Sequence, residues 1–316
     1  MPLISVIIPV YNSEKTIQET LESVLNQTFF ELVEIIVIND GSQDSTLEII
    51  SSLQDCRIKV FSYPNAGISA SRNRGISHAS GEFIAFLDHD DLWTPDKLES
   101  QLRALQENPQ AAVAYSWVDL IDESSQFIRS YSRLSITGNV QAELLVSNFL
   151  KTASNPLIRK EALIQVGGFE QSICGPEDWD LFLRMAAHYH FVAVPRSQVL
   201  YRMITGSAST NVFRQEAESL KVIDRAFTQA PESLQHLKKR TLSNLYKYLT
   251  FQSVELPSGR QSGLAATRCL WQAVRSDPSL LRQRTMLIAL LKIAAVVLLP
   301  SQQSKALLKT VKLLKR

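Results

Sequence analysis

The chain has 316 residues, of which 45% are hydrophobic and 20% charged, and its formal net charge is +2. This composition excludes a disordered or low-complexity chain and predicts a folded protein with room for one large domain and an appendage. Its three scattered cysteines exclude a disulfide framework and a zinc cluster, so we expect a reducing cytosol.

Strand and helix patterns alternate along the first third of the chain. Short β-branched runs predict strands at Ser5–Val10, Val33–Ile38, Ile58–Tyr63 and Glu82–Leu87. Apolar residues at helical spacing predict a helix behind Asn12 or Ser13, one capped by Asp44 or Ser45, one over Ile68–Ala79, and one capped by Thr94 with Pro95 at its first position. This alternation predicts a doubly wound α/β sheet with parallel strands and helices on both faces.

The alternation weakens after about residue 108. Further patterns predict strands at Ala111–Leu120, Thr152–Ile158 and Phe191–Tyr201, and helices at Val140–Phe149 and Glu177–Ala187. From Val212 onward the pattern is mainly helical. We therefore expect an α/β domain over residues 1–210 and a helical extension over residues 211–316.

Polar residues follow three of the predicted parallel strands, where each strand ends. Tyr11 and Asn12 follow the first strand, Asp40 follows the second, and a cluster of three aspartates, Asp88, Asp90 and Asp91, follows the fourth. Ligands of such sheets bind beyond the carboxyl ends of the strands. We therefore expect these residues to share one binding site.

The aspartate cluster is the feature that most needs an explanation. Three carboxylates within four positions raise one another's pKa and cost stability unless a positive charge lies among them. Mg²⁺ or Mn²⁺ commonly uses one or two carboxylates and completes its shell with water and phosphate oxygens. The alternative is a solvated acidic turn before the next helix, but the buried strand in front of the cluster favours the metal site.

Three other motifs have both a structural and a functional interpretation. Asp40 precedes Gly41 in a turn sequence, and it is either a turn residue or a hydrogen-bond acceptor for a nucleobase. Arg72 lies on a predicted helix and suits either phosphate or base recognition, or a solvated surface. Asp178 is either a general base or an acid that complements a helix N-terminus.

Taken together and in order, several stretches resemble the family 2 glycosyltransferases of the GT-A fold. They are SVIIPVYN, VINDGSQDST, NAGISASRNRG, GEFIAFLDHDDLW, the GGF of residues 167–169, PEDWDL, and YR…GSAS over residues 201–209. They cover roughly residues 4 to 210. The resemblance implies an inverting glycosyltransferase that uses a nucleotide diphosphate sugar, in the synthesis of a surface polysaccharide or glycolipid.

The resemblance also implies roles for individual residues. Asp178 would be the catalytic base and Asp90 the main metal ligand, with Asp88 beside the ribose and the metal. The nucleotide would be a UDP-sugar most often, the ion Mg²⁺ or Mn²⁺. The remaining residues of the nucleotide pocket would be Asp40 at the base, Arg72 at the base or phosphate, and Pro9, Tyr11 and Asn12 along the wall.

One position departs from the family pattern. Members often carry a histidine after the YR pair, where this chain has Ile204 and Thr205. We expect that Arg202 or Thr205 replaces this histidine, or that metal binding is weaker.

The C-terminal end differs in charge from the rest of the chain. Residues 278–316 hold eight basic residues and no acidic one, whereas residues 1–277 carry a net charge of about −6. The apolar stretch Met286–Pro300 is shorter than the roughly 20 residues that span a bilayer. The leucines and lysines of residues 304–316 favour a helix lying on an anionic membrane, although a buried helix with a basic end is an alternative.

Because the start of the chain also lacks a secretory signal pattern, we expect a cytoplasmic protein that binds the cytosolic face of the membrane peripherally and acts on a glycan or lipid-linked acceptor.

Two other functions remain open. A sugar-phosphate nucleotidyltransferase would share the sheet, but its Gly-rich, Lys-bearing phosphate loop is missing from the sequence. A catalytically silent protein that binds a nucleotide sugar is suggested by the missing histidine. Nucleic-acid binding is not expected, because the basic residues lie in a leucine-rich tail without an aromatic stacking platform.

Overall fold

The computed structural model describes residues 3–29, 32–204, 211–255 and 260–298. Contacts divide the chain into two compact units: Met1–Leu144 with Asn148–Ile204, and Leu145–Ser147 with Thr205–Arg316. The predicted domain boundary at residue 210 and the basic tail over residues 301–316 both lie outside the described residues.

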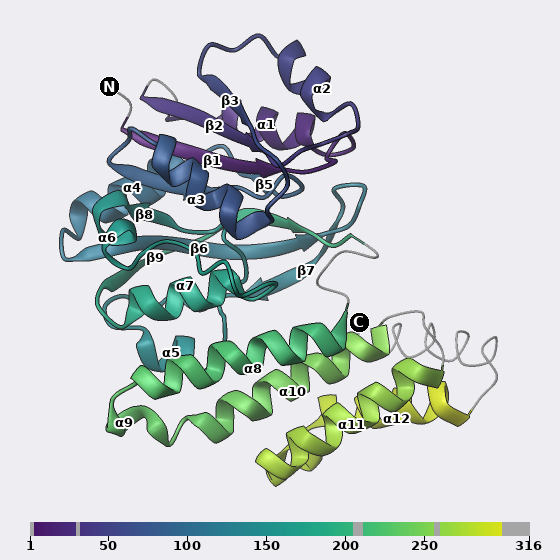
Figure 1. The fold of residues 1–316 in the computed structure, drawn as a ribbon. Coiled ribbons are helices and arrows are strands. Elements are labelled where there is room, and N and C mark those ends of the chain that lie inside the picture. The colour runs from purple at the N-terminus through teal and green to yellow at the C-terminus, as the bar shows by residue number, and fades with distance from the viewer. Residues whose placement is uncertain (1–2, 30–31, 205–210, 256–259, 299–316) are drawn as a thin grey trace. The chain divides into compact units, whose positions relative to one another are not determined.

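The first unit begins with four parallel strands in the order β3 (Ile58–Ser62), β2 (Val33–Asn39), β1 (Ile4–Val10) and β4 (Phe83–Phe86). Every residue of β1 and β2 is buried, as expected for parallel strands covered on both faces. Three helices connect these strands: α1 (Ile17–Leu25), α2 (Thr46–Ser52) and α3 (Ile68–His78). The predicted α/β architecture is confirmed (Figure 1).

Alternate residues of β1 show how helices cover both faces of the sheet. Val6 and Ile8 belong to the same buried cluster as Ile17 and Leu21 of α1. On the opposite face, a Cβ atom at Gly75 of α3 would overlap Ile7. Helix α3 therefore lies very close to the strand, and only glycine fits at this contact.

Beyond β4 the sheet becomes mixed. Strand β8 (Leu157–Arg159) pairs antiparallel with β4 and with β6 (Ala111–Ile121), and β9 (His190–Arg202) pairs parallel with β6. Two short strands that the sequence pattern did not predict complete it: β5 (Leu92–Trp93) on β9 and β7 (Phe127–Ser132) on β6. The helices of this part are α4 (Lys97–Glu107), α5 (Gln141–Val146), α6 (Lys160–Gln165) and α7 (Glu177–Ala186).

Four predicted boundaries are wrong, and one of them is that of α5, which ends at Val146 rather than at Phe149. Only the last residues of the predicted strand Thr152–Ile158 are extended, because the side chains of residues 152–155 bind neighbouring loops instead of a strand partner. Helix α4 begins at Lys97, after Asp96, rather than behind Thr94. Helix α1 begins at Ile17, because the side chains of Asn12 and Ser13 accept the N–H groups of Gln43 and Tyr11 instead of capping the helix.

The second unit is helical, as predicted. It contains α8 (Val212–Gln229), α9 (Glu232–Gln235), α10 (Lys238–Glu255), α11 (Arg260–Ser276), the 3₁₀ helix η2 (Pro278–Arg282) and α12 (Arg284–Leu298). Its core joins residues from four of these elements: Val254, Ala266, Leu270, Ala273, Leu280, Met286 and Ile293. None of the helices in the described part of the chain has both the length and the apolar character needed to cross a bilayer.

Candidate active site

The polar residues that follow the strands lie at one edge of the sheet. The registers align Val10 with Asn39 and Ile7 with Phe86, so β1, β2 and β4 end at the same side. Tyr11 and Asp40 follow the ends of β1 and β2 directly, and Asp88 follows β4 after Leu87. The structure thus brings the predicted residues to the carboxyl edge of the sheet (Figure 1).

Asp40 is buried and holds the loop in front of α3. Its two carboxylate oxygens accept the N–H groups of Ala66 and Gly67, at 2.9 and 2.8 Å. Arg74 donates to the same carboxylate at 3.2 Å. Asp40 therefore has the structural role that was one of its two interpretations, since it fixes a loop. Its contact with a nucleobase stays a prediction.

The loop after β1 is tied to the loop after β2. Asn12 has a left-handed backbone with φ of 49°, its N–H donates to Ser42 Oγ at 3.0 Å, and its side-chain oxygen accepts the N–H of Gln43 at 2.9 Å. Pro9 is buried within β1, whereas Tyr11 is 49% exposed. Tyr11 is the one of these three residues that presents a large apolar surface to a ligand.

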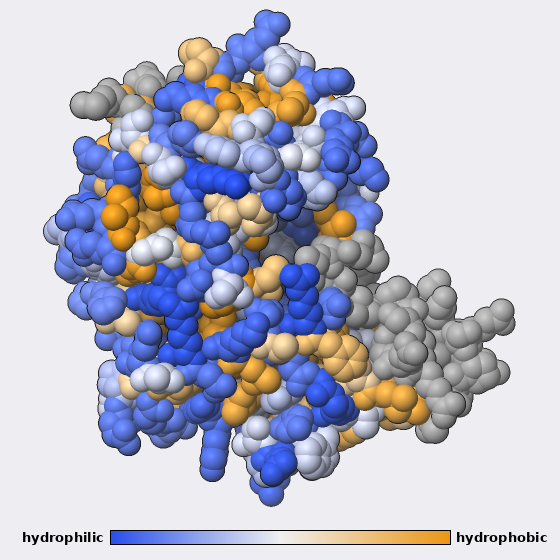
Figure 2. All heavy atoms as spheres, viewed as in Figure 1, coloured by the Kyte–Doolittle hydropathy of each residue, from blue (hydrophilic) through white to orange (hydrophobic). Residues whose placement is uncertain are grey.

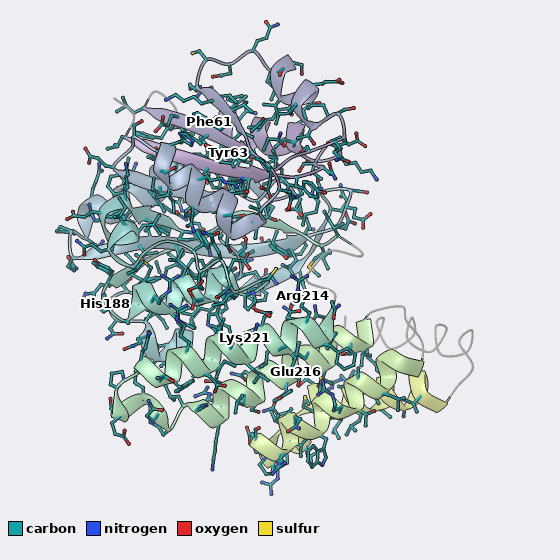
Figure 3. The ribbon with its side chains drawn as sticks, viewed as in Figure 1. Phe61, Tyr63, His188, Arg214, Glu216 and Lys221 are labelled. Carbon is teal, nitrogen blue, oxygen red and sulfur yellow. The ribbon has the colours of Figure 1, made fainter. Side chains whose placement is uncertain are left out.

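Helix α3 is also fixed along its length by β3. The guanidinium carbon of Arg74 lies 4.5 Å from the centre of the Tyr63 ring, and the Tyr63 hydroxyl is 2.7 Å from His78 Nε2. The His78 ring in turn stacks on Phe61 at 3.8 Å. Phe61 and Tyr63 are labelled near the β3 edge in Figure 3. These contacts give a rigid position to the helix that carries Arg72.

Both carboxylate oxygens of Asp88 are already bound by the protein. Arg72 donates to Oδ1 at 2.5 Å and the Thr152 hydroxyl donates to Oδ2 at 3.2 Å. The N–H of Asp88 donates to Ser154 Oγ at 3.0 Å. Asp88 is thus oriented before any ligand arrives.

Asp91 is an internal support of the aspartate cluster. Its Oδ2 accepts the Ser154 hydroxyl at 2.6 Å and its Oδ1 accepts the backbone N–H of Arg202 at 3.1 Å. Burial and the nearby charges of Asp90 and Asp88 raise its pKa well above the ordinary value. Because Asp91 is only 1% exposed, we assign it to holding the loop rather than to a ligand.

Asp90 is the member of the cluster that suits a cation. No side chain in residues 3–29, 32–204, 211–255 or 260–298 forms an ion pair with its carboxylate. Burial and the charge of Asp88 raise its pKa, against the opposing effect of His89. A cation beside it would remove this cost.

The donor set fits a metal ion that is completed by its substrate. Within the described residues, no group of three or more His, Cys, Asp or Glu side chains is arranged to hold a metal ion by itself. Mg²⁺ commonly uses only one or two protein carboxylates with phosphate oxygens and water. Asp90, with Asp88 beside it, meets that requirement.

Arg72 connects the aspartate cluster to helix α7. Its side chain is 2% exposed, and it pairs with Asp88 at 2.5 Å and with Glu177 at 2.9 Å. Although burial opposes it, the charges of these two carboxylates raise the pKa of Arg72. The structure therefore places Arg72 between two acids, a position that its sequence motif did not reveal.

Asp178 lies in the first turn of α7. Its Oδ1 accepts the N–H of Trp179 at 2.6 Å and lies 3.5 Å from Asn148 Nδ2. Burial, followed by the charge of Glu177, raises the pKa of Asp178 to about 7, and the nearby charge of Arg72 opposes this rise. A carboxylate with this pKa suits general base catalysis at neutral pH.

The GGF motif places the Phe169 ring against the guanidinium group of Arg72. A Cβ atom at Gly168, where φ is 69°, would lie 2.7 Å from Asn73 Oδ1. Asn73 needs this space because it binds both the N–H and the carbonyl of Phe169, at 2.9 and 2.8 Å. The Phe169 ring then lies 4.9 Å from the Arg72 guanidinium carbon, at a cation–π distance.

Arg202 holds the backbone of the aspartate cluster. Its Nε donates to the Asp90 carbonyl at 2.8 Å, while its two terminal nitrogens bind Ser125 Oγ at 2.9 Å and Glu19 at 2.7 Å. The expectation that Arg202 replaces the family histidine is therefore not met, since its donors already bind the protein. Thr205, the other expected replacement, lies outside the described residues.

The loop over residues 148–154 supports these acids and was not predicted from the sequence. Asn148 contacts Asp178, while Thr152 and Ser154 bind Asp88 and Asp91. The only local signal was the polar run TASN over residues 152–155, which interrupts an otherwise apolar stretch. No motif of the sequence connects this run to the cluster, because the contacts join residues more than 60 positions apart.

Comparisons with known proteins point to one enzyme family and one fold. An uncharacterized glycosyltransferase of Rickettsia bellii is 38% identical over 185 residues, which are 58% of this chain and 26% of that protein. This chain thus spans about a quarter of the length of that relative. Two solved structures share the fold: Staphylococcus aureus TarS 1–349 in complex with UDP, and the mannosyltransferase PcManGT of Pyrobaculum calidifontis in complex with GDP-Man and Mn²⁺.

The structural likeness extends over nearly the whole chain. TarS 1–349 has a TM-score of 0.62 and 21% identity, with 98% of this chain and 92% of that chain covered. PcManGT has a TM-score of 0.60 and 17% identity, with 98% and 84% covered. The profile of the family described as "Glycosyltransferase like family 2" matches residues 5–253. The chain therefore belongs to this glycosyltransferase family.

Proposed function

We propose that the protein transfers a sugar from a nucleotide diphosphate sugar to an acceptor hydroxyl, with inversion at the anomeric carbon. The observation that carries the proposal is the position of Asp178. Its pKa is raised to about 7, and its neighbour Glu177 shares one buried arginine with Asp88 of the aspartate cluster. The residue next to the proposed base and a carboxylate at the sheet edge thus bind the same arginine.

The chemistry follows from these groups. Asp178 accepts the proton of the acceptor hydroxyl while that oxygen attacks the anomeric carbon from the face opposite the departing diphosphate. One displacement inverts the configuration and needs no covalent sugar–enzyme intermediate. A Mg²⁺ or Mn²⁺ ion at Asp90, when bound, would neutralise the charge that develops on the leaving diphosphate.

The donor is proposed to be a UDP-sugar. The loops that carry Tyr11, Asn12 and Asp40 meet at the carboxyl edge of the sheet, where the nucleotide of a related fold binds. The TarS structure holds UDP, and the PcManGT structure holds GDP-Man with Mn²⁺. In this proposal Pro9 and Tyr11 line the nucleotide pocket, Asp40 meets the base, and Arg72 orients Asp88 toward the ribose and metal.

The stereochemical outcome tests the proposal. After a panel of UDP, GDP and TDP sugars identifies the donor, proton NMR of the first product shows its anomeric configuration. The proposal predicts a β product from an α-linked donor, together with dependence on Mn²⁺ or Mg²⁺. A product that retains the donor configuration would exclude Asp178 as the base of a single displacement.

We also propose a peripheral location on the cytosolic face of a membrane, with a glycan or lipid-linked acceptor. The support is the basic, leucine-rich sequence of residues 301–316. Deletion of these residues is expected to release the protein from membrane vesicles. Equal sedimentation of the shortened and full-length proteins with vesicles would refute this role of the tail.

A further inference from the structure

Helix α12 leaves a stripe of large apolar side chains exposed. Leu287 is 49%, Leu290 38% and Leu291 65% exposed, and Ala294 is also exposed. Their spacing places them on one side of the helix, while Met286, Ala289 and Ile293 fill the core of the second unit on the other. We call Leu287, Leu290, Leu291 and Ala294 the leucine face. Hydrophobic side chains reach the surface over α12 in the view of Figure 2.

An exposed stripe of this kind needs a partner. Single exposed leucines are common, but three on successive turns of one helix form a contiguous apolar surface, which marks an interaction site. The helix is too short to cross a bilayer, and its opposite side is already packed in the core. The partner must therefore contact this helix from one side only.

The charge around the leucine face decides which partner fits. Residues 260–298 contain six basic residues and a single acidic one, Asp277, although Lys292 is buried and Arg268 pairs with Glu216. Arg284 precedes Leu287 by three positions and Leu291 by seven, so the three residues lie on the same side of α12. Arg284 and Arg282 are both exposed. Two copies of this surface would repel each other, whereas an anionic surface would attract it.

We propose that the leucine face docks on an anionic lipid bilayer. The leucines enter the boundary between headgroups and acyl chains, and Arg282 and Arg284 bind lipid phosphates. This contact is made by a folded helix of the second unit and is separate from the basic tail that begins at residue 301. It does not depend on the donor, the metal or the base.

The test compares three forms of the full-length protein. The first is unchanged, the second carries Leu287→Gln and Leu291→Gln, and the third carries Phe127→Gln and Ile164→Gln. The control residues Phe127 and Ile164 are 64% and 56% exposed and lie in the first unit, so the same loss of apolar surface occurs elsewhere. Since glutamine is a good helix former and the replaced side chains are exposed, all three forms should fold, which circular dichroism and thermal unfolding check.

Binding is measured by co-sedimentation with vesicles of phosphatidylcholine alone or with phosphatidylglycerol added. We expect the unchanged protein and the control to bind anionic vesicles alike, and the leucine-face variant to bind at least tenfold more weakly. Binding of the unchanged protein should fall as salt rises, because salt screens the arginines. A further full-length form has Lys305, Lys309 and Lys312 changed to Gln, which weakens the contribution of the tail. Adding Leu287→Gln and Leu291→Gln to this form should weaken its vesicle binding again, because the leucine face binds separately from the tail.

Three results would overturn the proposal. Equal vesicle binding by the leucine-face variant and the control would show that the face is not the lipid contact. A dimer that light scattering detects in the unchanged protein and not in the leucine-face variant, with equal vesicle binding by both, would assign the face to a second copy. Stronger vesicle binding by the leucine-face variant would show that the face holds the chain's own tail.

Discussion

The pKa of Asp178 leads to a prediction about Glu177→Gln. Burial and the charge of Glu177 raise the pKa of Asp178 to about 7. In the unchanged enzyme only about a tenth of Asp178 is deprotonated at pH 6 and about nine tenths at pH 8. We therefore expect kcat/KM to rise about tenfold over this range and then to level off.

Glu177→Gln should move this rise to lower pH. The substitution removes a negative charge beside Asp178 and also frees the positive charge of Arg72, and both changes favour the deprotonated base. Two unit charges about 6 Å apart interact by about 3 kcal/mol at an effective dielectric of 20. This corresponds to about two pKa units, so after solvent screening we expect the midpoint to fall by about one unit.

The assay is the initial rate of nucleotide release at low donor concentration and saturating Mn²⁺, measured from about pH 5.5 to 9. Asp178→Asn serves as the reference without a base and should show no rise in this range. A midpoint for Glu177→Gln at or above that of the unchanged enzyme would refute the assignment of the rise to Asp178.

Three further predictions follow from the same contacts. Because the raised pKa of Asp178 makes its charged form costly, the unchanged protein should lose stability as pH rises from about 4 to 7. The free energy of unfolding of Asp178→Asn should therefore exceed that of the unchanged protein by up to about 4 kcal/mol at pH 8, with a higher melting temperature, but not at pH 4. Equal melting temperatures of the two proteins at both pH values would contradict this cost. Asp90→Asn should weaken Mn²⁺ activation about tenfold or more without lowering the melting temperature of the metal-free protein, because it removes a charge that burial makes costly, and an unchanged Mn²⁺ titration would exclude Asp90 as a ligand. Gly168→Ala should lower the free energy of unfolding in urea by about 1–3 kcal/mol, because the added methyl group meets Asn73 and φ is positive, whereas a loss below about 0.5 kcal/mol would show that the loop adapts.

The parallel half of the sheet was predictable because its signals are local. The apolar runs of β1, β2 and β4 and the helical spacing between them are each complete within a dozen residues. Strands β5 and β7 were missed since β5 has two residues and β7 is largely exposed, so neither has an apolar pattern of its own. The apolar residues that follow Thr152–Asn155 predict that this segment is extended as well. Its side chains instead bind residues elsewhere in the chain.

Motifs in the sequence indicate the candidate residues of the site, but not the residues that these candidates bind. Asp40, Asp88 and Asp178 each stand in a recognisable motif. The pair of Arg72 with Glu177, however, joins residues 105 positions apart, and no pattern in either motif contains the other. The same limit hid the full use of the Arg202 side chain, which binds residues of α1 and of the β6–β7 turn.

The most direct test of the central claim compares donor binding with donor turnover in the unchanged enzyme and in Asp178→Asn. Calorimetry measures binding of the donor with Mn²⁺, and release of the nucleotide measures turnover with cell lipid extract as the acceptor. We expect the two proteins to bind the donor with similar affinity and Asp178→Asn to turn it over at least a hundredfold more slowly. Donor binding by the unchanged protein without turnover, or full turnover by Asp178→Asn, would contradict the account.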